Sequence, residues 1–331
     1  MSDPGIPSGA LRVVTAANEP FWRCLWQFLR GLERVGWDAG VAVIVYDLGL
    51  GARRAALERR FPRAIFRTFD FTRHPPHVAR IGNYAWKPIL IAEVVDERAG
   101  DVLWLDSATL LRESLASVHR RIRLHPVFTL SGQSSLAQHC APQVLDTLAV
   151  PGPVRDRPEQ AGGVVGVCGD SPLARTVVAE WRDLALRPDF IEPSPPFPAH
   201  KSDQSLLSIV LHRRVLAGAL ELSGEEIDLS CPYPARWFTS RNKVVPGMPV
   251  WADPLVRAWY WSYKTVDQLL WRAKRFKATR VNGLHRWPKE SFQVFVQRDN
   301  ATPVALPAPR WSYYADPFVV ERDGQIGRAH V

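Results

Sequence analysis

The sequence predicts an α/β fold in which a mainly parallel sheet carries helices on both faces, followed by a smaller β-rich segment. Three observations support this prediction. The first 230 residues alternate short β-rich runs with helical patterns. The run over 41–46 is continuously apolar, as in strands that are covered on both faces. The chain has 331 residues, of which 46% are hydrophobic, and this is enough for a sizeable α/β domain and an appendage.

The expected elements follow one another in a regular order. Short runs rich in β-branched residues predict strands over 11–15, 41–46, 64–69, 101–105, 126–130 and 163–167. Helical periodicity predicts helices over 20–35, 53–60, 86–98, 173–186 and 202–213. In the first helix, for example, Phe21, Leu25 and Phe28 recur on one side. The turn around residues 160–163 is expected to precede the last strand.

Composition and charge exclude several classes of protein. No run approaches the ~18 apolar residues of a membrane span, and the first residues lack the pattern of a signal peptide, so a cytoplasmic location is predicted. The net charge is +9, but residues 241–290 alone hold eleven Lys and Arg against three acidic residues. A basic balance this local does not favour nucleic-acid binding. The four cysteines are widely spaced and are expected to be reduced core thiols.

The composition also suggests where the chain divides. Residues 1–243 are predicted to form the α/β domain and residues 244–290 a basic, aromatic helical linker. The linker helix begins at Asp253 and Pro254, a favourable N-cap and first residue. The simpler interpretation is that its aromatic face packs as a connector. The alternative is a peripheral contact of residues 253–277 with an anionic membrane surface at the inner face.

Polar side chains follow four of the predicted strands. They are Asn18, Asp47, Asp70 and Asp106. Because ligands bind at the carboxyl ends of parallel strands, these groups are candidates to hold a ribose or a divalent cation. The alternative is that the Asp residues only form turns and cap helices.

Other motifs in the sequence are weak. The loop of Gly49 and Gly51 resembles a dinucleotide loop, but Arg54 stands where its third glycine belongs. His74 and His77 have the spacing of metal ligands, but no helix is predicted to aim both rings, so a loop pair is favoured.

Four ordered motifs carry a resemblance over roughly residues 11–230. They are Asn83-Tyr-Ala-Trp-Lys-Pro, Val102-Leu-Trp-Leu-Asp-Ser-Ala-Thr109, Ala161-Gly-Gly163 and His200-Lys-Ser-Asp-Gln-Ser-Leu-Leu207. Together they resemble nucleotide-diphospho-sugar glycosyltransferases of the GT-A type, whose fold is Rossmann-like. The chain is most similar to a branch that carries Tyr-Ala-Trp-Lys-Pro, and it is more distantly similar to glycogenin-like transferases.

The resemblance implies roles for particular residues. Lys87, Asp203 and Gln204 are expected at the catalytic centre, where Lys87 reaches the phosphates or braces the metal-site Asp. The Asp-x-Asp motif holds a divalent cation, Mn²⁺ or Mg²⁺, on the donor diphosphate, and its first member matches Asp106. Its second member falls on Ala108, and this loss of a ligand weakens metal binding or leaves it to cationic side chains. The residues expected to bind the nucleotide sugar are Thr15, Ala16, Asn18, Asp47, Arg80, Gly162 and Gly163.

The implied reaction is transfer of a sugar from a nucleoside diphosphate sugar to a hydroxyl acceptor, either a glycan or a lipid-linked group. Stabilisation of the leaving diphosphate would drive it, with Asp203 as any base. Ala108 also keeps open a protein that binds glycans or nucleotide sugars without catalysis. A glycoside hydrolase would instead require two carboxylates ~5–10 Å apart across a sugar.

The end of the chain carries a second resemblance. Residues 310–324, which include Ala315-Asp-Pro-Phe318, are similar to the first blade of the five-bladed propeller in glucosamine inositolphosphorylceramide transferase proteins. The segment 291–324 is too short to close a propeller, so a truncated first blade is predicted. Residues 325–331 resemble a one-frame translation of a sequencing adapter and are expected to be a non-native tail.

Overall fold

A computed structural model of the chain describes residues 9–37, 40–97, 100–111 and 115–225. Beyond them it describes only 238–239, 262, 266, 269, 273, 295–296, 304–305, 319–322 and 325–328. The chain divides into two compact units, Met1–Asp253 and Pro254–Val331. Each unit is described by itself.

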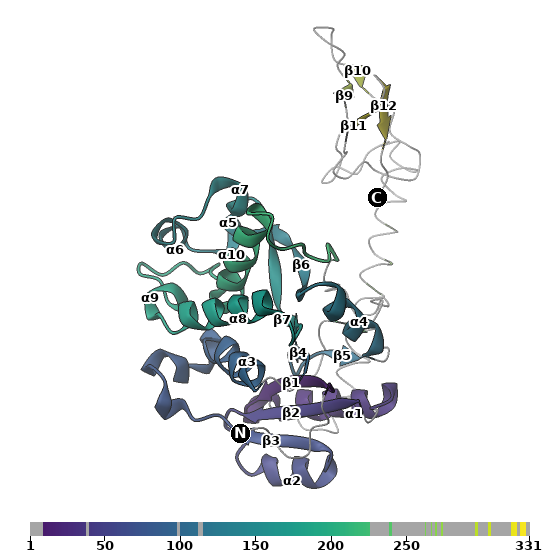
Figure 1. Cartoon of the computed structure of the whole chain (residues 1–331), viewed down its shortest axis with the longest axis vertical. Helices are drawn as coiled ribbons and strands as arrows, with labels where there is room; N and C mark the ends of the chain where they lie inside the picture. Colours follow the sequence, from purple (N-terminus) through teal and green to yellow (C-terminus); the bar gives the residue numbers. More distant parts are fainter. Residues whose placement is uncertain are drawn as a thin grey trace. The chain divides into compact units, whose positions relative to one another are not determined.

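A six-stranded sheet forms the centre of the first unit (Figure 1). Its strands are β1 (Leu11–Ala17), β2 (Val41–Asp47), β3 (Ala64–Thr68), β4 (Val102–Leu105), β6 (Val127–Ser135) and β7 (Pro158–Val167). They lie in the order β3-β2-β1-β4-β7-β6. Strands β1 to β4 pair in parallel, whereas β7 is antiparallel to both β4 and β6. The predicted mainly parallel α/β fold is therefore confirmed.

Helices cover both faces of the sheet because successive strand residues point to opposite sides. Val14 and Ala16 of β1 belong to one apolar cluster, and Val13 and Ala17 belong to the other. The first cluster includes residues of α3 (Trp86–Asp96), α8 (Pro172–Ala185) and α10 (Ser202–Leu216). The second includes residues of α1 (Trp22–Val35), α2 (Arg53–Arg60) and α4 (Ala116–Leu124).

Short elements connect these layers. The 3-10 helices are η1 (Glu19–Phe21), η2 (Phe71–Arg73), η3 (Pro76–Ala79) and η4 (Ile81–Asn83). The short α-helices are α5 (Leu136–His139), α6 (Pro142–Thr147), α7 (Gly152–Arg155) and α9 (Pro188–Ile191). A separate strand pair joins β5 (Leu110–Leu111) to β8 (Phe238–Thr239). The described cysteines, Cys24, Cys140 and Cys168, form no disulfide with one another.

One local prediction was wrong. Residues 160–163 were expected to form a turn, but they lie inside β7. Because β7 runs antiparallel to β4, its first half lies beside the carboxyl end of β4, and the backbone N–H of Asp106 donates to the carbonyl of Gly163 at 3.0 Å. The glycines therefore reach the expected edge of the sheet from within a strand.

The second unit contains two described strand pairs. Strands β9 (Phe295–Val296) and β10 (Val304–Ala305) are antiparallel, as are β11 (Val319–Arg322) and β12 (Gln325–Arg328). Arg322 pairs with Gln325, and β12 lies within residues 325–331, whose interpretation as a non-native tail stays a prediction. The rest of the predicted blade, and most of the linker helix over 253–277, lie outside the described residues. The four isolated positions between 262 and 273 have helical backbone.

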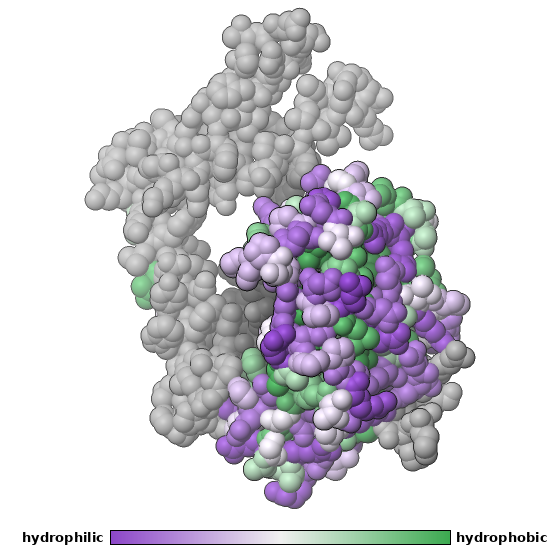
Figure 2. All heavy atoms as spheres, turned by 90° about the vertical axis from the view of Figure 1, so that its left-hand side faces the viewer, coloured by the Kyte–Doolittle hydropathy of each residue, from purple (hydrophilic) through white to green (hydrophobic). Residues whose placement is uncertain are grey.

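Hydrophilic residues predominate on the face of the first unit in Figure 2, and hydrophobic ones appear between them. Among the described residues, no helix combines the length and the apolar character that a membrane span requires. Membrane contact by residues 253–277 stays a prediction.

Candidate functional site

Three residues that are distant in the sequence meet at the carboxyl edge of the parallel strands. The ammonium of Lys87 lies 3.4 Å from Oδ1 of Asp106 and 3.1 Å from Oδ2 of Asp203. It also donates a hydrogen bond of 3.2 Å to the carbonyl oxygen of Gly162. Three oxygens therefore lie within 3.4 Å of this ammonium. Lys87 and Asp203 are buried, whereas the side chain of Asp106 is 41% exposed.

The local structure explains how these side chains converge. Lys87 is the second residue of α3, which packs on the same face of the sheet as Trp104. Asp106 follows Trp104 by two residues, and the indole Nε1 of Trp104 donates to its Oδ1 at 3.0 Å. Asp203 is the second residue of α10, where the positive end of the helix dipole favours a carboxylate. Trp181 of α8 fixes this end of α10 by donating to the carbonyl of Asp203 at 2.8 Å.

The protonation of the cluster reflects its burial and its charges. Burial alone would lower the pKa of Lys87, but the charges of Asp106 and Asp203 together outweigh it and hold this pKa above its ordinary value. Burial raises the pKa of Asp203 to about 6, although the ammonium of Lys87 acts in the opposite direction. At neutral pH, Lys87 is therefore charged and Asp203 is mostly ionised.

Two glycines let these carboxylates lie against the backbone of β7. A Cβ on Gly162 would lie 3.1 Å from Oδ2 of Asp203 and 3.6 Å from Nζ of Lys87. A Cβ on Gly163 would lie 3.0 Å from Oδ2 of Asp106. A larger residue at either position would press on these acidic side chains, so the two glycines allow Asp106 and Asp203 to approach β7 closely.

Gln204 joins this site through a group that sequence reasoning missed. Its Oε1 accepts from the backbone N–H of Gly162 at 3.2 Å, and its Nε2 donates to Oε2 of Glu159 at 3.0 Å. Lys201 donates to the same Oε2 at 2.7 Å. Glu159 is 1% exposed. The available signal was an acidic residue three positions before Gly162, in a segment that was expected to be a turn.

The three residues predicted to bind the nucleotide sugar at the end of β1 have different surroundings. Ala16 lies on the same face as Trp104 and is 6% exposed. Thr15 is fully buried, and alternation along β1 turns its side chain towards the face of Val13. Asn18 is partly exposed and caps η1 without a side-chain hydrogen bond. Of these three residues, Asn18 is thus the one with appreciable exposure.

The carboxylates after β2 and β3 serve local structure. Oδ1 of Asp47 accepts from the backbone N–H groups of Gly49 and Leu50 at 2.7 and 2.6 Å. Asp70 caps η2 by accepting from the backbone and hydroxyl of Thr72. Both therefore match the alternative of turn formation and capping. Arg80 is exposed and forms an ion pair with Glu192.

The described residues do not make a divalent-cation site by themselves. Oδ1 of Asp106 already has Trp104 and Lys87 as partners, Asp203 is buried against Lys87, and Ala108 supplies no ligand. In the described part of the chain, no group of three or more His, Cys, Asp or Glu side chains is arranged to hold a metal ion. His77 instead bonds the carbonyl of Ala185, and His74 stacks on Phe69.

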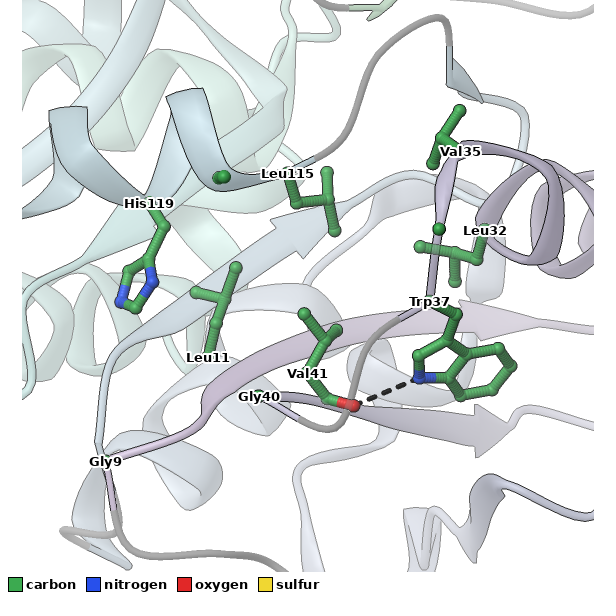
Figure 3. A pocket seen from close by; sticks show the side chains of 11 residues that line it. Gly9, Leu11, Leu32, Val35, Trp37, Gly40, Val41, Leu115 and His119 are labelled. Atoms are coloured by element: carbon green, nitrogen blue, oxygen red, sulfur yellow. Dashed lines mark hydrogen bonds between the residues drawn. The ribbon is translucent and has the colours of Figure 1, made fainter.

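A separate cavity of about 220 Å³ lies near the amino ends of β1 and β2, where Leu11 and Val41 line it (Figure 3). Its walls are mainly apolar, with Trp37 bonded to the carbonyl of Val41 and the His119 ring at one end. Because β1, β2 and β4 are parallel, this cavity is at the opposite edge of the sheet from Asp106.

The comparisons with known proteins concern overall structure only. The sequence matches no family model and no curated protein. Among solved structures, the bifunctional glycosyltransferase WbbM is similar with a TM-score of 0.44 and 14% identity over 63% of this chain, and the match spans 38% of that longer chain. Mouse xyloside xylosyltransferase 1 is similar with a TM-score of 0.45 and 11% identity over 73% of this chain and 99% of the other. The galactosyltransferase LgtC, in complex with donor and acceptor sugar analogues, is similar with a TM-score of 0.38 and 16% identity. This match covers 60% of this chain and 70% of LgtC. At these TM-scores the similarity carries no argument about function.

Proposed function

We propose that this chain is a glycosyltransferase that moves a sugar from a nucleoside diphosphate sugar to a hydroxyl group of a glycan or a lipid-linked acceptor. The observation that supports it is the junction of Lys87, Asp106, Gly162 and Asp203 at one edge of the sheet. The sequence resemblance names each of these residues independently of their distances.

The proposed roles follow from burial. The carboxylate of Asp106 is the acidic group of the cluster that a substrate can reach, because its side chain is 41% exposed. Lys87 holds Asp106 and Asp203 in place, since its ammonium lies within ion-pair distance of both carboxylates and donates to the carbonyl of Gly162. Of the two roles expected for Lys87, bracing the Asp is thus favoured over direct contact with phosphate. Asp203 is buried and supports Lys87, so it is less suited to act as a base on the acceptor.

In the proposed reaction, the bond between the anomeric carbon and the diphosphate oxygen breaks, and the electron pair leaves with the diphosphate. A new bond forms from the acceptor oxygen to the anomeric carbon, and the proton of the hydroxyl passes to a base or to water. Gly162 and Gly163 keep the carboxylates of Asp203 and Asp106 close to the backbone of β7, where the sugar is proposed to bind. The protein contributes mainly by orienting the two substrates.

The test is a panel of uridine, guanosine and thymidine diphosphate sugars with the full chain, measured as release of the nucleoside diphosphate with and without Mn²⁺. Gly163→Ala is expected to lower release about 10- to 100-fold, because its Cβ displaces Asp106. Gly152→Ala is the matched control, since a Cβ there meets nothing within 4 Å. No release with any donor would refute the proposal.

A non-catalytic protein that binds nucleotide sugars is the second candidate. Ala108, in place of a second acidic residue, favours it. This candidate predicts saturable binding of uridine diphosphate or a uridine diphosphate sugar by calorimetry, without release of product over hours.

A further inference from the structure

Glu159 is a buried acidic residue of β7 for which neither a turn nor a cap gives a role. Its side chain is 2% exposed, and its Oε2 accepts from Lys201 and Gln204. Its Oε1 is buried and has no hydrogen-bond partner among the residues that the structure describes. A buried carboxylate with incomplete partners is costly, and such a group calls for an explanation other than stability.

Another buried carboxylate of the same domain is fully satisfied. Asp101 has no exposed surface, and its two oxygens receive the backbone N–H of Gly169, the ring of His119 and the guanidinium of Arg123. The fold is therefore able to saturate a buried acid where only stability is concerned. Glu159 differs because its partners lead towards the candidate site.

The carboxamide of Gln204 lies between Glu159 and Gly162. The backbone N–H of Gly162 requires an acceptor, and the carboxylate of Glu159 requires a donor. Both partners therefore select the same orientation, with Oε1 towards Gly162 and Nε2 towards Glu159. Gly162 in turn bonds Lys87 through its carbonyl, so the contacts continue from Glu159 to the ion cluster.

We propose that Glu159 is a positioning residue that fixes the orientation of the Gln204 carboxamide, and with it the sugar-facing side of the site. This inference rests on the proposed function, because the resemblance alone assigns Gln204 to the neighbourhood of the transferred sugar. Without the carboxylate, one end of the Gln204 carboxamide loses its partner, and the side chain is free to rotate. Misplacement of a reacting group by about 1 Å costs a rate factor on the order of 100.

The kinetic test uses the full chain and the donor that is active in the panel above. Glu159→Ala is expected to lower kcat about 10- to 100-fold while KM for the donor changes less than about threefold. Glu159→Gln is isosteric, and its kcat is expected to lie between those of the wild type and Glu159→Ala. The reason is that its amide can present either a donor or an acceptor to Gln204. Unfolding curves confirm that both variants are folded at the assay temperature.

A double-mutant cycle separates positioning from a general structural role. If Glu159 acts through Gln204, the change Glu159→Ala has no further effect on kcat in a Gln204→Ala background. Independent, multiplicative losses would overturn the proposal. Lys201→Met is the matched control, since it removes the other partner of the same Oε2. A loss of kcat in Lys201→Met as large as that in Glu159→Ala would assign the role to Lys201 and would also overturn the proposal.

A readout without turnover distinguishes this inference from the proposed function. In protein labelled with ¹⁵N-glutamine, the side-chain NH₂ signal of Gln204 is assigned by its loss in Gln204→Ala. Glu159→Ala is expected to shift this signal towards that of an exposed glutamine, and Lys201→Met to leave it nearly in place. An unmoved signal in Glu159→Ala refutes the positioning itself. A wild type that releases no product from any donor refutes the proposed function, even if the signal moves.

Discussion

Two buried cations lie at opposite ends of helix α3, and their surroundings differ. Near the carboxyl end, Arg12 donates to the carbonyls of Val94 and Gly100 at 2.5 and 2.8 Å and pairs with Glu97. At the amino end, Lys87 is held by Asp106 and Asp203 and by a single carbonyl. Arg12 is fully buried and Lys87 is 4% exposed, so burial does not distinguish them.

The helix dipole explains the difference. The carboxyl end of a helix carries partial negative charge, which adds to the attraction of Glu97 for Arg12. The amino end carries partial positive charge, so Lys87 at the second position requires acidic neighbours. Burial is the main factor that lowers the pKa of Arg12, whereas the carboxylates raise that of Lys87. A cation placed against the dipole, together with two acids, indicates a site that stability alone does not explain.

The largest loss of stability is expected from breaking the pair of Lys87 and Asp203 at the amino end of α3. Lys87→Met leaves Asp203 buried without its cation and is expected to lower the free energy of unfolding by about 3–5 kcal/mol at pH 7.5. Adding Asp203→Asn removes the unpaired charge and should restore most of this loss. Urea denaturation of the three proteins measures both steps. A double variant no more stable than Lys87→Met would contradict the pairing.

Removing the cation at the carboxyl end should cost stability alone. Arg12→Met leaves the carbonyls of Val94 and Gly100 without their donor, and the expected loss is about 2–4 kcal/mol. Affinity for uridine diphosphate, measured by calorimetry on the folded variant, should stay within twofold of the wild type. A large loss of affinity would show that the two ends are not functionally distinct.

The pH dependence of stability tests the raised pKa of Asp203. The pKa of this group is about 6 in the folded protein and 3.8 as its ordinary value, so the folded protein binds the proton more tightly. Its contribution to stability is fully present below about pH 3.8 and is lost as the pH rises through about 6. Between pH 7 and pH 5, the wild type should gain stability relative to Asp203→Asn by an amount on the order of 1–2 kcal/mol. A difference that is constant over this range in urea denaturation, or that changes in the opposite direction, would refute the assigned pKa.

The smallest expected effect comes from adding a carboxylate two residues after Asp106. Ala108→Asp supplies the second acid of the motif, and affinity for Mn²⁺ in the presence of uridine diphosphate is expected to rise about tenfold, because Mn²⁺ prefers several oxygen ligands. Electron paramagnetic resonance of free Mn²⁺ gives the measurement. Asp106→Asn in the Ala108→Asp protein is the control and should abolish the gain. Unchanged affinity in Ala108→Asp would argue that the motif does not face a cation.

The sequence by itself determined the order of the main elements of the first unit. Strand and helix periodicity are local properties, and the predicted helix over 53–60 coincides with α2. The motif residues Lys87, Asp106 and Asp203 are far apart in the sequence, and the structure brings them together. The alternative of turn formation, stated for Asp47 and Asp70, is what their hydrogen bonds support.

Only the tertiary structure decided how these parts meet. The antiparallel direction of β7 depends on strand pairing across the sheet, and no local pattern carries it; yet this direction brings Gly162 and Gly163 to the carboxyl edge of β4. The ammonium of Lys87 lies near three oxygens from three separate parts of the chain. The link from Glu159 through Gln204 to Gly162 joins β7 to α10 and has no sequence signature. Side-chain contacts of this kind are properties of packing, because each partner restricts the other only after the chain has folded.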